Sequence, residues 1–134
     1  MFGQLLIAMA VTLGCIAPAA AAPIMLTCTG SVVQWSPERI EGNVSPPASA
    51  TIDIDQRTLR VLGGTYTITD VRESELLLSG SSSELVFFGN VDRNAGTISI
   101  TGMRPEERDK LHKGQSGHMS IVFNLNCAPA KRMF

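Results

Sequence analysis

Short runs of alternating apolar and polar residues are the main pattern of the chain from residue 26 onward. Ile52 and Ile54, for example, alternate with two aspartates. The same period of two recurs in residues 59–61, 66–68, 98–100 and 119–127. This period is typical of a strand that turns one face to a core and the other to solvent. The pattern therefore predicts an all-β fold of roughly seven or eight short strands.

The final segment, residues 119–127, has the clearest alternation. Its odd-numbered positions are apolar and end at Cys127, whereas its even-numbered positions are mostly polar. Near the start of the pattern, Cys28 has the same phase as Leu26. Both cysteines are therefore predicted to point into the core, one from the first strand and one from the last.

Two further runs, residues 76–78 and 85–88, are apolar without alternation. Such runs are typical of strands that are covered on both faces, or of strands whose outer face carries some exposed apolar surface. Elsewhere, Gly63 and Gly64 follow the short run that ends at Val61. This glycine pair predicts a tight hairpin turn between two antiparallel strands.

Two segments depart from the strand pattern. Residues 36–49 are polar and contain three prolines, so they are expected to form a long loop. Residues 104–114 have proline at their second position and glycine at their end, which are the signals of a short helix. Two opposite-charge pairs four residues apart favour this helix, namely Glu106 with Lys110 and Asp109 with Lys113. We expect it to cross between the last two strands.

The first part of the chain is interpreted as a cleavable secretory signal peptide, residues 1–21. Residues 5–16 are almost entirely apolar, which matches the ~7–15 residues of a signal-peptide core and falls short of the ~20 of a membrane span. Cleavage between Ala21 and Ala22, within a tract of small residues, would leave residues 22–134 as a single β domain. The segment before the apolar run lacks a basic residue, so an uncleaved anchor stays open as an alternative.

Cys15 raises a second alternative, a lipoprotein that carries lipid on this cysteine. Gly14 is a suitable small residue before it, but Thr12 stands where an aliphatic residue is expected, and the residues after Cys15 stay apolar. We therefore expect Cys15 to be removed with the leader. The mature chain would then work in the periplasm or outside the cell.

Loss of the leader leaves two cysteines, Cys28 and Cys127, and in an oxidising compartment these are expected to form one disulfide. Two isolated thiols with no neighbouring histidine do not suit zinc. Closing a loop of about 100 residues stabilises a fold by ~4.7 kcal/mol in the chain-entropy model. The bond would hold the first strand near the last. This arrangement favours a small antiparallel meander barrel, with a β-sandwich as the alternative.

Charge and composition narrow the classes of function. The chain has 11 basic and 12 acidic residues and a formal net charge of −1, so nucleic acid and anionic membrane surfaces are not expected partners. His112 and His118 lie in or beside the predicted helix, and a metal site that used both would need a carboxylate ligand such as Glu106 or Asp109. Two surface histidines are the simpler explanation. The serine-rich turn 79–83 lacks the Gly-x-Ser-x-Gly pattern of hydrolases. We expect no catalytic residue, no metal and no cofactor, and thus a protein that is not an enzyme.

Short pieces at both ends of the β domain carry a resemblance. Leu26-Thr27-Cys28 and the late segment 126–134, together with the alanine-rich leader and Asp-bearing hairpins, resemble small exported bacterial β proteins without an assigned activity. In general plan the chain is also similar to periplasmic inhibitors of lysozyme, which are small disulfide-tied β-barrels. That resemblance implies a barrel and an inhibitor-type role. The Ser-Gly-x-x-Tyr loop of the C-type inhibitors is not present in the sequence.

These observations predict a monomeric binding protein that contacts a protein or another envelope component through its loops. The candidate surfaces are the loop 36–49 and the charged helix, whose candidate partner-binding residues are Arg104, Glu106, Arg108, Lys110 and His112. A solvated helix face is the simpler explanation of the same residues. A small-molecule binder that uses the barrel interior is the alternative, but the inner rows are mostly large side chains, which would fill such a cavity. A lipoprotein or inhibitor-type envelope protein is the third hypothesis.

Overall fold

The computed structural model describes residues 14, 21–35 and 38–130, and strands dominate these segments. The elements are β1 (Ile24–Trp35), β2 (Arg39–Asn43), β3 (Ala48–Asp53), β4 (Thr58–Val61), β5 (Gly64–Val71), β6 (Glu75–Ser81), β7 (Val86–Asp92), β8 (Thr97–Met103), α1 (Pro105–His112) and β9 (Ile121–Pro129). The predicted all-β class is confirmed. Apart from Gly14 and Ala21, the predicted signal peptide with its Cys15 lies outside the described residues.

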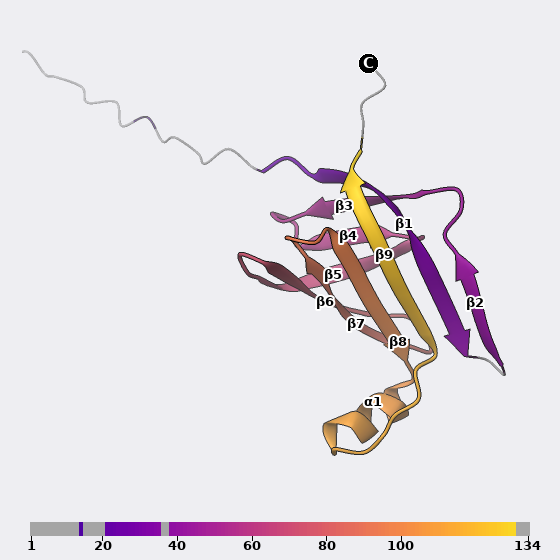
Figure 1. Ribbon diagram of the computed structural model, residues 1–134. Helices are drawn as coiled ribbons and strands as arrows, with labels where there is room; N and C mark the ends of the chain where they lie inside the picture. Colours follow the sequence, from indigo (N-terminus) through magenta and orange to yellow (C-terminus); the bar gives the residue numbers. More distant parts are fainter. Residues whose placement is uncertain (1–13, 15–20, 36–37, 131–134) are drawn as a thin grey trace, which may run out of the picture.

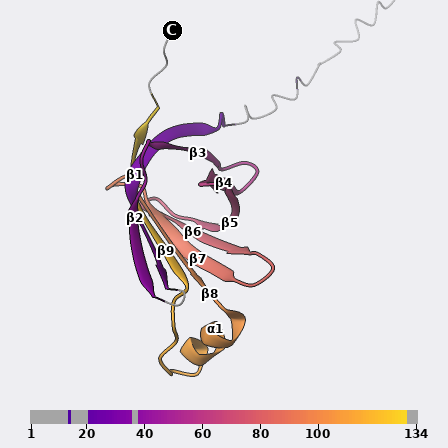
Figure 2. The same cartoon turned by 90° about the vertical axis from the view of Figure 1, so that its right-hand side faces the viewer.

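Eight of the strands close into an antiparallel barrel (Figures 1 and 2). From β3 to β9 each strand pairs with the next one along the chain, and β1 pairs with both β3 and β9. The β1–β9 register is long, from Leu26 opposite Pro129 to Gln34 opposite Ile121. The barrel, rather than the sandwich kept as its alternative, is therefore the architecture of the described chain.

β2 is an additional strand that lies outside the closed ring. One edge of β1 pairs with β9, whereas the other edge is divided between β3 and β2, which pairs with residues 31–35. The prediction of an uninterrupted loop over residues 36–49 was wrong, because Arg39–Asn43 form this strand. All five of its residues are exposed. Its backbone groups form hydrogen bonds with β1. Its sequence has no apolar alternation from which the strand could have been predicted.

Inward-facing side chains fill the barrel, as the alternation predicted. Among them, the fully buried ones are Cys28, Leu59, Ile68, Leu76, Ile98, Ile100 and Leu125. Toward the α1 end, the Tyr66 ring packs edge to face against Phe87, with 5.6 Å between the ring centroids. Burial raises the pKa of the Tyr66 hydroxyl. Large side chains of this kind occupy the interior of small barrels and leave little space for a ligand.

The hairpin between β4 and β5 turns one residue earlier than predicted. Val61 pairs with Gly64, so Leu62 and Gly63 are the central residues of the turn. Their φ angles are 50° and 75°, and positive φ at both central positions is the requirement of a type I′ turn. Leu62 thus adopts a conformation that usually favours glycine, because the pairing of the flanking strands fixes the turn.

The predicted helix is confirmed as α1, which connects β8 to β9. It begins at Pro105, and Gly114 follows its end with a φ of 75°. The ion pairing differs from the prediction, because Lys110 Nζ lies 3.0 Å from Glu107 Oε1 rather than pairing with Glu106. Within the part of the chain that the structure describes, no helix has the length and apolar character needed to cross a membrane.

The predicted disulfide between Cys28 and Cys127 is present. The two residues lie directly opposite each other in the β1–β9 register and are separated by 99 positions in the sequence. Cys28 is fully buried. The disulfide therefore locks the seam at which the first and last barrel strands meet.

Candidate functional site

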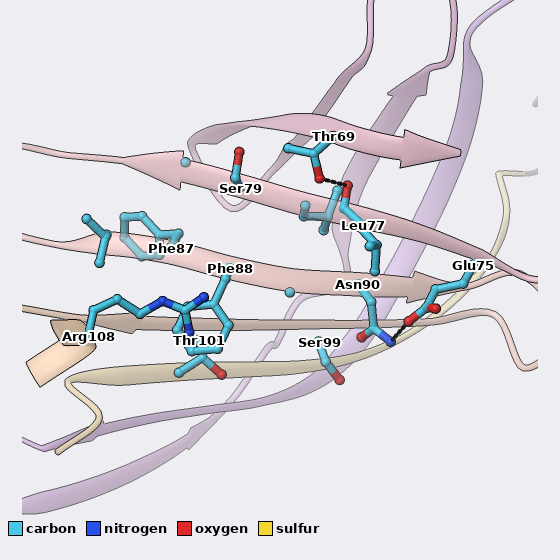
Figure 3. Close-up of a pocket in the computed structure, with 14 residues that line it drawn as sticks. Thr69, Glu75, Leu77, Ser79, Phe87, Phe88, Asn90, Ser99, Thr101 and Arg108 are labelled. Atoms are coloured by element: carbon cyan, nitrogen blue, oxygen red, sulfur yellow. Dashed lines mark hydrogen bonds between the residues drawn. The ribbon is translucent and has the colours of Figure 1, made fainter. Parts of the chain in front are cut away.

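An open trough of about 830 Å³ lies on the outer wall of the barrel (Figure 3). It is formed by outward side chains of β6, β7 and β8, with α1 at one end. The register places these side chains in rows across the three strands. We call this surface the outer trough and define it by Leu77, Ser79, Phe88, Asn90, Ser99, Thr101 and Arg108.

The apolar floor of the outer trough follows from the two unbroken apolar runs of the sequence. Side chains of a strand alternate between its faces, so such a run must place some apolar groups outside the barrel. Leu76 and Leu78 are buried inside, whereas Leu77 and Phe88 point outward and are half-buried. Of the two interpretations of these runs, the one with apolar surface on the outer face is confirmed.

One end of the outer trough is formed by Arg108, which extends from α1 over β7. Its guanidinium carbon lies 3.9 Å from the centroid of the Phe88 ring, within the range of a cation–π interaction. Among the described residues, no ion pair involves Arg108. The ring therefore holds the guanidinium in place while its N–H groups keep the capacity to bind an anionic ligand.

The other end of the outer trough is polar and internally paired. Asn90 Nδ2 donates a hydrogen bond of 2.8 Å to Glu75 Oε1, and the second carboxylate oxygen lies 3.6 Å from a guanidinium nitrogen of Arg72. The Thr69 hydroxyl donates to the carbonyl of Leu77 at 3.3 Å. Arg72 is shared with Asp70, whose carboxylate lies 2.9 Å from its Nε. Glu75 is thus engaged by Asn90 and Arg72, and Arg108 is the cationic group of the trough that is available to a ligand.

The structure separates the five helix residues that were predicted to bind a partner. Arg108 is the one of them that lines the outer trough. Arg104 lines a different hollow, at the end of β1 and the start of β9. Lys110 is engaged with a neighbouring carboxylate on α1, and Glu106 and His112 are exposed. The helix therefore does not present these five residues as one patch.

Glu107 anchors the segment that leads from α1 to β9. One carboxylate oxygen accepts a 2.9 Å hydrogen bond from the backbone N–H of His118, and the other accepts a 3.0 Å bond from Lys110 Nζ. The His118 hydrogen bond, followed by that of Lys110, holds the pKa of the Glu107 carboxyl below its usual value. Sequence reasoning missed this residue, because the bond joins positions that are brought together only by the fold.

Two aspartates that the sequence places near hairpins also serve as structural acceptors. Asp53 accepts the backbone N–H of Gln56 at 2.9 Å, and Asp92 accepts those of Asn94 and Ala95, each at 2.9 Å. Both carboxylates therefore stabilise turns. Within residues 21–35 and 38–130, no group of three or more His, Cys, Asp or Glu side chains could hold a metal ion.

A small apolar pocket of about 160 Å³ opens at the barrel end opposite α1. Inward residues such as Leu26, Ile52 and Leu76 line it, together with Cys127. A cavity of ~150 Å³ accommodates a molecule the size of benzene, whereas ligand sites for larger small molecules have about 300–1,000 Å³. The barrel interior therefore has room for one small apolar group.

The residues that line the outer trough together with Arg108 were not identified from the sequence. Phe88, Asn90 and Thr101 lie on two strands, and their juxtaposition depends on the β7–β8 register. The alternation pattern does not specify which residues of two strands face each other. The unbroken apolar run at residues 85–88 was the signal that this outer face differs from a solvated one.

Comparisons of the chain with protein-family models, with curated proteins and with solved structures found no match. The functional interpretation therefore depends on the residues of this chain alone. The most developed arrangement among them is the outer trough, which has at one end an aromatic ring and a guanidinium that forms no ion pair with the described residues.

Proposed function

We propose that this chain is an exported, non-enzymatic binding protein whose outer trough holds an extended segment of a partner protein. In this proposal a carboxylate of the partner binds the Arg108 guanidinium. The observation that carries it is the position of Arg108, 3.9 Å above the Phe88 ring and outside every ion pair of the described residues. The binding surface is thus the barrel wall beside α1 rather than the loops.

The composition of the outer trough supports a protein partner. Arginine and aromatic residues are enriched among the side chains that contribute most to protein–protein binding. Leu77 and Phe88 supply apolar contact area, and the hydroxyls of Ser99 and Thr101 offer hydrogen bonds along the wall. An arginine held by stacking loses less conformational freedom on binding than a free one, which favours affinity.

Export is the second part of the proposal, and two features support it. Residues 1–21 have the composition of a signal peptide, and the Cys28–Cys127 disulfide suits an oxidising compartment. The small-molecule alternative is less well supported, because the apolar pocket at the barrel end is only about 160 Å³.

Selection from a library of random peptides tests the proposal. We expect the immobilised protein to enrich extended peptides with an aspartate or glutamate at one fixed position. Addition of an enriched peptide should shift the NMR amide signals of Phe88, Asn90, Ser99 and Thr101 more than those of β4, on the other side of the barrel. Enrichment without an acidic position, or shifts centred away from the outer trough, would contradict it.

A further inference from the structure

The outer edge of β2 is a free strand edge. The backbone N–H of Val44 donates to the carbonyl of Gly30 at 2.8 Å, which makes these two residues a hydrogen-bonded pair of the β1–β2 ladder. Such pairs alternate along an antiparallel ladder, so the backbone groups of Ile40 and Gly42 also point toward β1. Those of Arg39, Glu41 and Asn43 consequently point away from it, and within the described residues no other strand pairs with β2.

The side chains of β2 combine one exposed apolar group with two opposite charges. Ile40 is 58% exposed, the highest value among the large hydrophobic residues that remain exposed in the described chain. Arg39 and Glu41 lie on the other face of the strand, with 3.6 Å between a guanidinium nitrogen and a carboxylate oxygen. In Figure 1, β2 lies at the margin of the molecule, beyond β1.

We propose that β2 pairs antiparallel with β2 of a second copy of this chain, so that the two barrels share a continuous sheet. The charges select the register. In the favoured register, Arg39 lies opposite Glu41 of the second copy, and each arginine faces a glutamate. The backbone N–H and C=O groups of these residues, which point away from β1, then form hydrogen bonds between the two copies. The register shifted by one step, with Glu41 opposite Glu41 of the second copy, would place like charges in contact, which is destabilising.

The same register brings the two Ile40 side chains together. They become a directly opposed pair without backbone hydrogen bonds, in which the side chains approach most closely. Association would therefore bury an apolar group that the single molecule leaves in water. This proposal is independent of the outer trough, which lies on β6, β7 and β8.

The dimer is expected to be weak, because β2 has five residues and the register provides only about four intermolecular backbone hydrogen bonds. An interface of this size lies below that of stable protein complexes. The expectation of a monomer then describes the protein at low concentration, and dimers form as the concentration rises.

Charge reversal with sedimentation velocity tests the register. Arg39→Glu and Glu41→Arg should each weaken self-association on the order of tenfold, because two cross-strand pairs become like-charged. The double variant, Arg39→Glu with Glu41→Arg, should restore it, since every arginine again faces a glutamate. Equal self-association of the wild-type protein, the two single variants and the double variant would overturn the proposal. A double variant that self-associates as weakly as the single variants would overturn it too.

Cysteine crosslinking tests the contact itself. In the full chain, where Cys15, Cys28 and Cys127 are common to every variant, Ile40→Cys should form a covalent dimer under mild oxidation. Asn43→Cys is the matched control, because residue 43 is far from its counterpart in this register. Absence of a crosslink for Ile40→Cys, or equal crosslinking of both variants, contradicts the pairing. The charged side chains of β2 would then serve to prevent pairing of this edge with other strands.

Discussion

Single residues of this barrel are constrained most tightly where neighbouring strands approach each other. At Gly89, a Cβ atom would overlap the backbone carbonyl oxygen of Ser99 and lie 2.9 Å from the Cα of Ile100. Both contacts are with the backbone of β8, which is fixed by its own pairing with β7 and β9. A side chain at residue 89 would therefore force the two strands apart.

Gly89→Ala is expected to lower the free energy of unfolding by about 1–3 kcal/mol, the usual cost of overpacking. Gly42→Ala is the matched control, because among the described residues no heavy atom beyond those of the adjacent positions lies within 4 Å of a Cβ built there. Denaturation in urea measures both. Equal stability of the two variants would show that β8 accommodates the added methyl group.

Glu107 predicts a pH dependence at the α1 end of the barrel. Its folded-state pKa lies below the usual 4.5, so the anchoring of His118 is present above about that pH. It is lost as the pH falls through the lowered pKa. The His118 amide should therefore become more accessible to hydrogen exchange in acid. In Glu107→Gln, exchange of the His118 amide should be faster already at neutral pH and should change little as the pH falls. Identical pH dependence of this exchange in both proteins would refute the anchoring role of Glu107.

Sequence reasoning located some residues and missed others for physical reasons. Cys28 and Cys127 were identified because the strand period fixes which face a side chain occupies. Leu62 was not assigned to the turn, because its positive φ is imposed by the register of the flanking strands. Arg108 was identified as a charged helix residue, but its contact with Phe88 depends on where α1 lies against the sheet.

The same distinction applies at the scale of elements. β9 was predicted because it alternates clearly, with one face toward the core. β2 was interpreted as part of a loop, because all its residues are exposed and its stabilisation comes from backbone pairing with β1. Local propensity and periodicity therefore identify elements that have one face buried in the core. They do not identify a strand that is stabilised only by backbone hydrogen bonds along one edge.

The disulfide between β1 and β9 is expected to contribute strongly to stability, because it closes a sequence separation of 99 residues. The chain-entropy model gives ~4.7 kcal/mol for a loop of about 100 residues. Replacing Cys28 and Cys127 together with alanine should therefore markedly lower the midpoint of thermal unfolding in oxidising buffer. The difference from the wild-type protein should largely disappear when a reductant is present, and equal midpoints in oxidising buffer would contradict the role of the disulfide.

At the scale of the whole molecule, the barrel follows from the meander of hairpins and from the proximity of its first and last strands. Both features could be predicted from the sequence, whereas closure through β1 required the full register.

Export with removal of the leader is a separate prediction. The protein recovered from its own host should begin at Ala22 and have a mass that includes one disulfide, as measured by intact mass spectrometry. A mass that retains residues 1–21, or that includes a lipid on Cys15, would contradict cleavage between Ala21 and Ala22.

In the proposed function, the outer trough binds a protein segment through the Arg108 guanidinium. The most direct test compares the affinity of one selected acidic peptide for the wild-type protein, for Arg108→Ala and for Arg60→Ala, a matched control on the exposed part of β4. We predict that Arg108→Ala weakens binding at least about tenfold, as expected for an arginine central to an interface, and that Arg60→Ala leaves it unchanged. Equal affinities for the wild-type protein and both variants would contradict a role of Arg108 in binding.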